Sequence, residues 1–178
     1  MMQWAKGEQP PIHAEGSGGR QVYDDMDKYG NVYDHFAVAY KWEDGSRGYH
    51  FSRQQNGTFG SYELELYGSK GTCSAKNRHT IIAGDSSWRY RGEKNDMYQT
   101  EHDTLFSSIR NGEPFNDGER SAHSTMVAIL GRMVAYTGQK ITYEEALNSK
   151  ENLTPSHYDW GKPLPTPSPP IPGVTRFV

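Results

Sequence analysis

The strongest secondary-structure signal in the chain is residues 31–42, which read NVYDHFAVAYKW. Successive side chains of a strand point to opposite faces, and here large apolar residues occupy every second position. Residues 43–45, Glu-Asp-Gly, are typical of a hairpin turn because glycine tolerates positive φ. We therefore expect a return strand over about 47–55. One face of the first strand would be apolar and would carry Phe36, Val38, Tyr40 and Trp42.

Outward from this hairpin, strand signals come first and helix signals follow. Short alternating or β-rich runs predict a meander of strands, and apolar residues at helical spacing then predict helices. The expected strands cover 12–16, 62–66, 72–75, 79–83 and 88–91, and the expected helices cover 101–110, 116–136 and 142–148. This order predicts an α+β fold class, an open, mostly antiparallel sheet with helices packed on one face.

The C-terminal end has a different composition. Residues 162–178 are rich in proline, which excludes a regular helix or an interior strand. We expect a domain over 1–161 and an extended tail over 162–178, either loose or laid on a partner subunit.

Bulk composition excludes several function classes. With 178 residues the chain is expected to hold one domain. Its 19 basic and 22 acidic residues leave no broad basic field, so we expect no nucleic-acid partner. No apolar run is long enough to span a membrane, so no membrane partner is expected. The single cysteine, Cys73, cannot form an intrachain disulfide.

Two patterns in the sequence suggest a dinucleotide-binding loop and a metal site, but neither meets the spacing that such a site requires. Residues 16–19, Gly-Ser-Gly-Gly, suggest a dinucleotide-binding loop, but that motif must open an apolar helix, and three aspartates follow instead. We interpret this stretch as a glycine-rich turn and expect no cofactor-binding residue. The histidines lack metal-ligand spacing, so no metal site is predicted.

The end of the return strand carries polar side chains. Arg53 and Gln55 would share one face of the strand, and Gln54 would point to the other. Side chains with several hydrogen-bond donors can hold sugar hydroxyls. A solvated or dimer-facing strand end is an equally good interpretation.

Several segments, in order, resemble the C-terminal half of bacterial Gfo/Idh/MocA oxidoreductases. The resemblance covers essentially the whole chain. The segments are Gly18–Val22, Tyr33–Val38, Phe51–Gln55, Tyr67–Thr72, Tyr98–His102, Ser107–Gly112, Ser124–Met133, Ile141–Thr142 and Glu145–Ser149.

The resemblance implies a sheet-and-helix domain whose open sheet face often forms the subunit interface, so a homo-oligomer is expected. The family's nucleotide-binding domain and its catalytic lysine and histidine motifs would lie before Met1, so no catalytic residue is expected here. The parent enzyme would bind NAD or NADP and oxidise or reduce a sugar or cyclitol hydroxyl. This chain alone would bind no cofactor and would be inactive. We expect substrate contacts from Arg20, Gln21, His35, Arg53 and Gln54.

Two alternatives stay open. The chain could be a stand-alone, non-catalytic sugar-binding or assembly module, or part of a lyase or hydratase that acts on oxidised sugars. Localisation is also open: a cytoplasmic location is favoured, and export of a full-length parent is the alternative, since any export signal would precede Met1.

Overall fold

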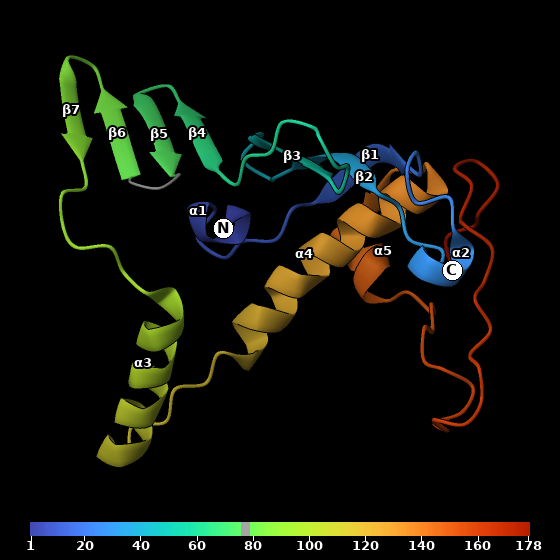
Figure 1. The fold of residues 1–178 in the computed structure, drawn as a ribbon. Coiled ribbons are helices and arrows are strands. Elements are labelled where there is room, and N and C mark those ends of the chain that lie inside the picture. The colour runs from blue at the N-terminus through green and yellow to red at the C-terminus, as the bar shows by residue number, and fades with distance from the viewer. Residues whose placement is uncertain (76–78) are drawn as a thin grey trace. The chain divides into compact units, whose positions relative to one another are not determined.

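The computed structural model describes residues 1–75 and 79–178, with the backbone alone at His79. These residues form two compact units, which are described separately. The larger unit combines 3–58 with 120–178, and the smaller unit combines 59–119 with Met1–Met2. Figure 1 shows the helices and strands of both.

The larger unit is built on a four-stranded sheet of order β3-β2-β1-β8 in which every neighbouring pair is antiparallel. The predicted hairpin is confirmed, and Gly45 in its turn has φ of 82°. The two strands of the hairpin pair from His35 opposite Arg53 to Lys41 opposite Arg47. The strand bounds are β1 His13–Gly19, β2 His35–Lys41, β3 Arg47–Arg53 and β8 Ile141–Thr142.

One face of this sheet is covered by helix α4, Gly118–Thr137 (Figure 1). The Tyr40 hydroxyl donates a hydrogen bond to the backbone oxygen of Val127 at 3.1 Å. Leu130 and Val134 of the helix are fully buried. The predicted apolar face is therefore confirmed, and it lies under a helix. Its buried members in and beside β2 are Val38, Tyr40 and Trp42.

The glycine-rich stretch at residues 16–19 is not a turn. It is the second half of β1, and it pairs residue by residue with β2 from Gly16 opposite Val38 to Gly19 opposite His35. A Cβ at Gly16 would lie 2.9 Å from the Cα of Val38, which no side chain tolerates. Glycine is therefore needed here for close strand approach rather than for a bend.

The smaller unit holds a second four-stranded antiparallel sheet, β4-β5-β6-β7. Its strands are β4 Leu64–Gly68, β5 Gly71–Ala75, β6 His79–Ala83 and β7 Ser86–Arg89. Helix α3, Met97–Asn111, begins four residues earlier than expected because Asp96 caps it by accepting from the Tyr98 and Gln99 backbone. The α+β class with open antiparallel sheets is confirmed, although the described residues form two sheets rather than one.

Short helices complete the larger unit. Helix α5, Tyr143–Leu147, starts at the predicted capping box, in which Thr142 and Glu145 each accept from the other's backbone nitrogen. Gly138, with φ of 71°, directly follows α4, as expected. Two short helices, α1 Met2–Ala5 and α2 Met26–Tyr29, were not predicted from the sequence.

The proline-rich tail contains no helix or strand. Its end nevertheless lies on the chain's own larger unit. The Gly173 backbone nitrogen donates to the Thr137 oxygen at 2.8 Å, and the Tyr33 hydroxyl donates to the Pro170 oxygen at 2.7 Å. The backbone nitrogen of Lys150 donates to the oxygen of Val178 at 3.1 Å. These bonds fix the end of the tail beside α4, while the domain boundary at 161 remains a prediction.

Candidate functional site

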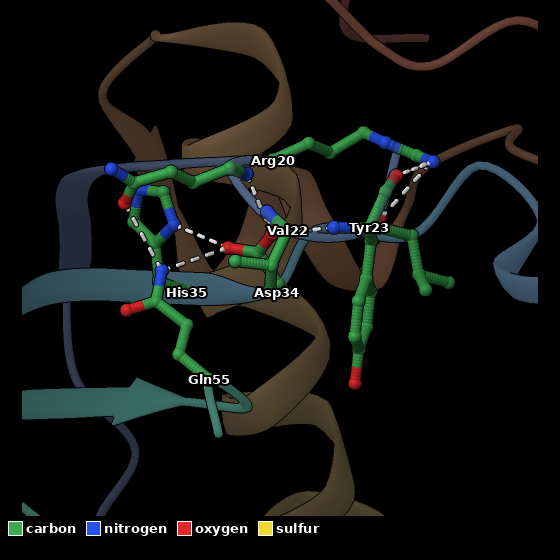
Figure 2. Close-up of polar contacts among 8 residues, drawn as sticks. Arg20, Val22, Tyr23, Asp34, His35 and Gln55 are labelled. Atoms are coloured by element: carbon green, nitrogen blue, oxygen red, sulfur yellow. Dashed lines mark hydrogen bonds and ion pairs between the residues drawn. The ribbon is translucent and has the colours of Figure 1, made fainter. Parts of the chain in front are cut away.

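The main polar cluster of the larger unit is centred on Asp34, at the start of β2. Its carboxylate is fully buried. Oδ2 accepts hydrogen bonds from the backbone nitrogens of Gln21, Val22 and Tyr23 at 2.6, 2.7 and 3.1 Å. Oδ1 lies 2.6 Å from Nδ1 of His35. Figure 2 shows these groups converging on the carboxylate.

These contacts determine the charge of the cluster. Burial alone would raise the pKa of Asp34, but hydrogen bonds from Val22, His35, Gln21 and Tyr23 outweigh it and hold the pKa well below its usual range. Asp34 is therefore an ionised, buried acceptor that ties the segment after β1 to the start of β2.

The carboxylate also fixes the tautomer of His35. An ionised carboxylate can only accept, so Nδ1 of His35 carries the proton and Nε2 is left as the acceptor of the neutral ring. The His35 side chain is 40% exposed, and its Nε2 edge lies against Gly19, where a Cβ would come within 3.3 Å. The absence of a side chain at residue 19 thus leaves room for an oriented, accessible imidazole.

Two glutamines extend the cluster towards solvent. The Gln55 Nε2 donates to the Gln21 side-chain oxygen at 3.2 Å and lies 3.4 Å from Oδ1 of Asp34. Gln21 is exposed and Gln55 is half-buried. Amide groups held in this way offer both donors and acceptors to a hydroxylated ligand.

The remaining predicted substrate contacts lie near the cluster but differ in what they do. The Arg20 guanidinium donates to the backbone oxygens of Gly30, at 2.5 Å, and of Tyr23, so it braces the loop between β1 and β2. Arg53 lies directly opposite His35 in the neighbouring strand and is exposed. The backbone N–H of Gln54 donates to the backbone oxygen of Asp34 at 2.8 Å, and the Gln54 residue is exposed. The structure therefore brings all five predicted residues to one end of the sheet, and their contact with substrate remains a prediction.

Asp34, which organises the cluster, was not among the expected contacts, and Gln55 was named only for its place on a strand face. One signal was present: Asp34 is a carboxylate at the start of an otherwise apolar strand, where burial requires several hydrogen-bond donors. Nothing in the sequence indicated that residues 21–23 would supply those donors. Strand β3 ends at Arg53, so the strand-face argument does not apply to Gln54 and Gln55.

The glycines of β1 do not form a nucleotide cradle. Residues 16–19 continue a strand and are followed by a loop rather than by a helix N-terminus, so they do not fit a dinucleotide phosphate. Within 1–75 and 79–178, no group of three or more His, Cys, Asp or Glu side chains is placed to hold a metal ion. In the same residues, no helix is long and apolar enough to cross a membrane.

The chain is similar to known proteins in its fold. No protein-family model matches the chain, and no curated protein matches it in sequence. Among solved structures, it is similar to the aldose-aldose oxidoreductase of Caulobacter crescentus complexed with glycerol. That match has a TM-score of 0.64 at 14% identity and covers 79% of this chain and 43% of that one.

Two further solved structures extend this similarity. An oxidoreductase of Agrobacterium radiobacter, in complex with NAD⁺, L-tartaric acid and magnesium, matches with a TM-score of 0.54 at 10% identity, over 76% of this chain and 44% of that one. A myo-inositol dehydrogenase of Corynebacterium glutamicum matches with a TM-score of 0.50 at 20% identity, over 75% and 43%. The chain spans less than half the length of each of these proteins. It therefore has the fold of the C-terminal domain of Gfo/Idh/MocA-type oxidoreductases.

Proposed function

We propose that the chain is the substrate-binding and assembly part of an NAD(P)-dependent oxidoreductase that acts on a hydroxyl group of a sugar or cyclitol. The observation that carries this proposal is the shared fold. Four-fifths of the chain superposes on about two-fifths of an aldose-aldose oxidoreductase. The nicotinamide and the groups that handle the proton would belong to a part outside these 178 residues.

The Asp34 cluster supports a substrate-binding role. Sugars and cyclitols are recognised through hydroxyl groups that both donate and accept hydrogen bonds. Here one buried carboxylate holds the His35 ring and the Gln55 amide, and the Gln55 amide in turn donates to the side-chain oxygen of Gln21. Such fixed side chains lose little conformational freedom when a ligand binds.

The sheet face opposite α4 supports an assembly role. Tyr49 and Phe51 of β3 alternate with residues that face the helix side, and they are 60% and 76% exposed. Ala37 and Ala39 of β2 lie opposite them in register and extend the apolar surface. A second copy of the chain covering this face would remove the two aromatic rings from water.

Calorimetric titration of the whole chain tests the proposal. We expect weak, saturable binding of at least one member of a panel containing myo-inositol, scyllo-inositol and common aldoses. We expect no binding of NAD⁺ or NADP⁺ under the same conditions. Sedimentation measured in parallel should show a homo-oligomer that a Tyr49→Asp, Phe51→Asp double variant dissociates. Tight NAD⁺ binding, or no response to any polyol, would contradict the proposal.

A further inference from the structure

A second polar site lies at the opposite end of the same sheet face. His13, Lys41 and Arg47 are directly opposite one another across β1, β2 and β3. They line a pocket together with Glu15 and Lys140. Lys140 directly precedes β8, which pairs with the start of β1. Residues from four strands or their ends therefore converge on one place.

This pocket carries an excess of positive charge. Three cationic side chains, those of Lys41, Arg47 and Lys140, face a single carboxylate, that of Glu15, in a chain whose net charge is −3. Within the residues that the structure describes, none of the three cations makes an ion pair or a side-chain hydrogen bond. Glu15 offsets only one of the three positive charges, and the remaining like charges repel one another, so binding of an anion would stabilise the fold.

The positive charges of the pocket also act on its histidine, His13. The pKa of His13 is lowered, first by burial and then by the charges of Lys140, Lys41 and Arg47, against the opposing effect of Glu15. Its Nδ1 is buried, and no hydrogen-bond partner lies near it among the described residues. A buried nitrogen without a partner costs stability, and a hydrogen bond to a ligand would recover part of that cost.

We propose that this pocket binds a small oxyanion, the phosphate or carboxylate group of a small molecule. The guanidinium of Arg47 matches two oxygens of such a group, and Lys41 and Lys140 supply point charges around it. The row of His13 lies six residues along β1 from the row of His35, or about 20 Å. One monosaccharide cannot reach both places, so this site is separate from the Asp34 cluster and does not depend on its proposed role.

Titration of the isotope-labelled whole chain with inorganic phosphate tests this inference by nuclear magnetic resonance. The ring signals of His13 should move saturably with phosphate and should not move with chloride at matched ionic strength. A Lys41→Gln, Arg47→Gln double variant should bind phosphate about tenfold more weakly or worse. A matched Lys150→Gln, Lys162→Gln variant removes two exposed lysines elsewhere in the same unit and should bind phosphate as the wild type does.

Each other outcome overturns the proposal. If His13 in the wild-type chain shows no saturable response, or responds equally to chloride, there is no oxyanion site. This arm decides the matter even if the double variant fails to fold, which circular dichroism would reveal. If the folded double variant keeps its phosphate affinity and loses only its oligomeric state, the cations pair with carboxylates of a second copy instead.

Discussion

Asp34 and His35 are neighbours in sequence whose side chains meet at 2.6 Å, between Oδ1 of the carboxylate and Nδ1 of the imidazole. The other carboxylate oxygen accepts three backbone N–H groups from residues 21–23. One buried group therefore both orients the exposed imidazole and closes the loop between β1 and β2. The candidate site consequently depends on a residue that a ligand would not reach.

Replacement of Asp34 by Asn should strongly destabilise the larger unit. Asparagine is neutral and has a single acceptor oxygen, so the three backbone donors and the His35 ring would lose a charged partner and one of its two acceptor atoms. We expect the free energy of unfolding to fall by about 2–4 kcal/mol. Urea denaturation followed by circular dichroism measures this. The control, Asp24→Asn, changes an exposed carboxylate of the same loop and should have little effect. Equal, small losses for both variants would contradict the account.

Acid should unfold the chain partly through Asp34. Its pKa in the folded state lies below the ordinary value of about 3.9. The stability that it contributes is therefore fully present above that value and is lost as the pH falls through the folded-state pKa. The urea midpoint of the wild type should drop steeply from about pH 5 to about pH 2, and that of Asp34→Asn should drop less over the same range. Parallel curves would show that Asp34 is not the group responsible.

Helix α4 approaches the sheet closely only because residue 131 has no side chain. A Cβ at Gly131 would overlap the Tyr40 hydroxyl oxygen, and the next atom of that ring would be 3.4 Å away. Gly131→Ala should therefore cost about 1–3 kcal/mol. In a Tyr40→Phe background the overlap is gone, so the same change should cost much less. A double-mutant cycle of unfolding free energies measures the coupling, and additive effects would refute the close contact.

Gln3 offers a gain in stability. It is only 4% exposed, and its side-chain nitrogen and oxygen have no hydrogen-bond partner among the described residues. Methionine has a similar shape and no amide to desolvate, so Gln3→Met should raise the free energy of unfolding by about 1–2 kcal/mol. Gln9→Met changes an exposed glutamine nearby in sequence and serves as the control. A thermal melt that shows no rise for Gln3→Met alone would mean that the amide is satisfied.

Local patterns in the sequence predicted the hairpin, the buried face of β2 and the start of α5. Each of these depends on neighbouring residues: alternation along a strand, a glycine in a turn, or the reciprocal bonds of Thr142 and Glu145. The same kind of pattern gave a wrong prediction at residues 16–19, because glycine is typical of turns. Only the short distance to β2 shows why glycine is needed here within a strand.

The sequence supplied the names of several residues near the candidate site but not the contacts that hold the site together. Arg20, Gln21, His35, Arg53 and Gln54 were expected from the family resemblance, and the observed pairing of β1, β2 and β3 brings them to one end of the sheet. The role of Asp34 could not be predicted, because its donors at residues 21–23 come from a loop whose path no local pattern specifies. The same loop brings backbone oxygens within hydrogen-bond distance of the Arg20 guanidinium, whereas the sequence alone shows only a positively charged residue.

The central claim is that the Asp34 end of the sheet contacts a sugar or cyclitol. Chemical-shift mapping of the labelled whole chain with the polyol that binds in calorimetry tests it most directly. The side-chain amides of Gln21 and Gln55 and the ring of His35 should shift together. His35→Phe should abolish the shifts, whereas His50→Phe, which alters an exposed histidine on the other face of the sheet, should preserve them. Shifts confined to other residues, or unchanged binding by His35→Phe, would contradict the claim.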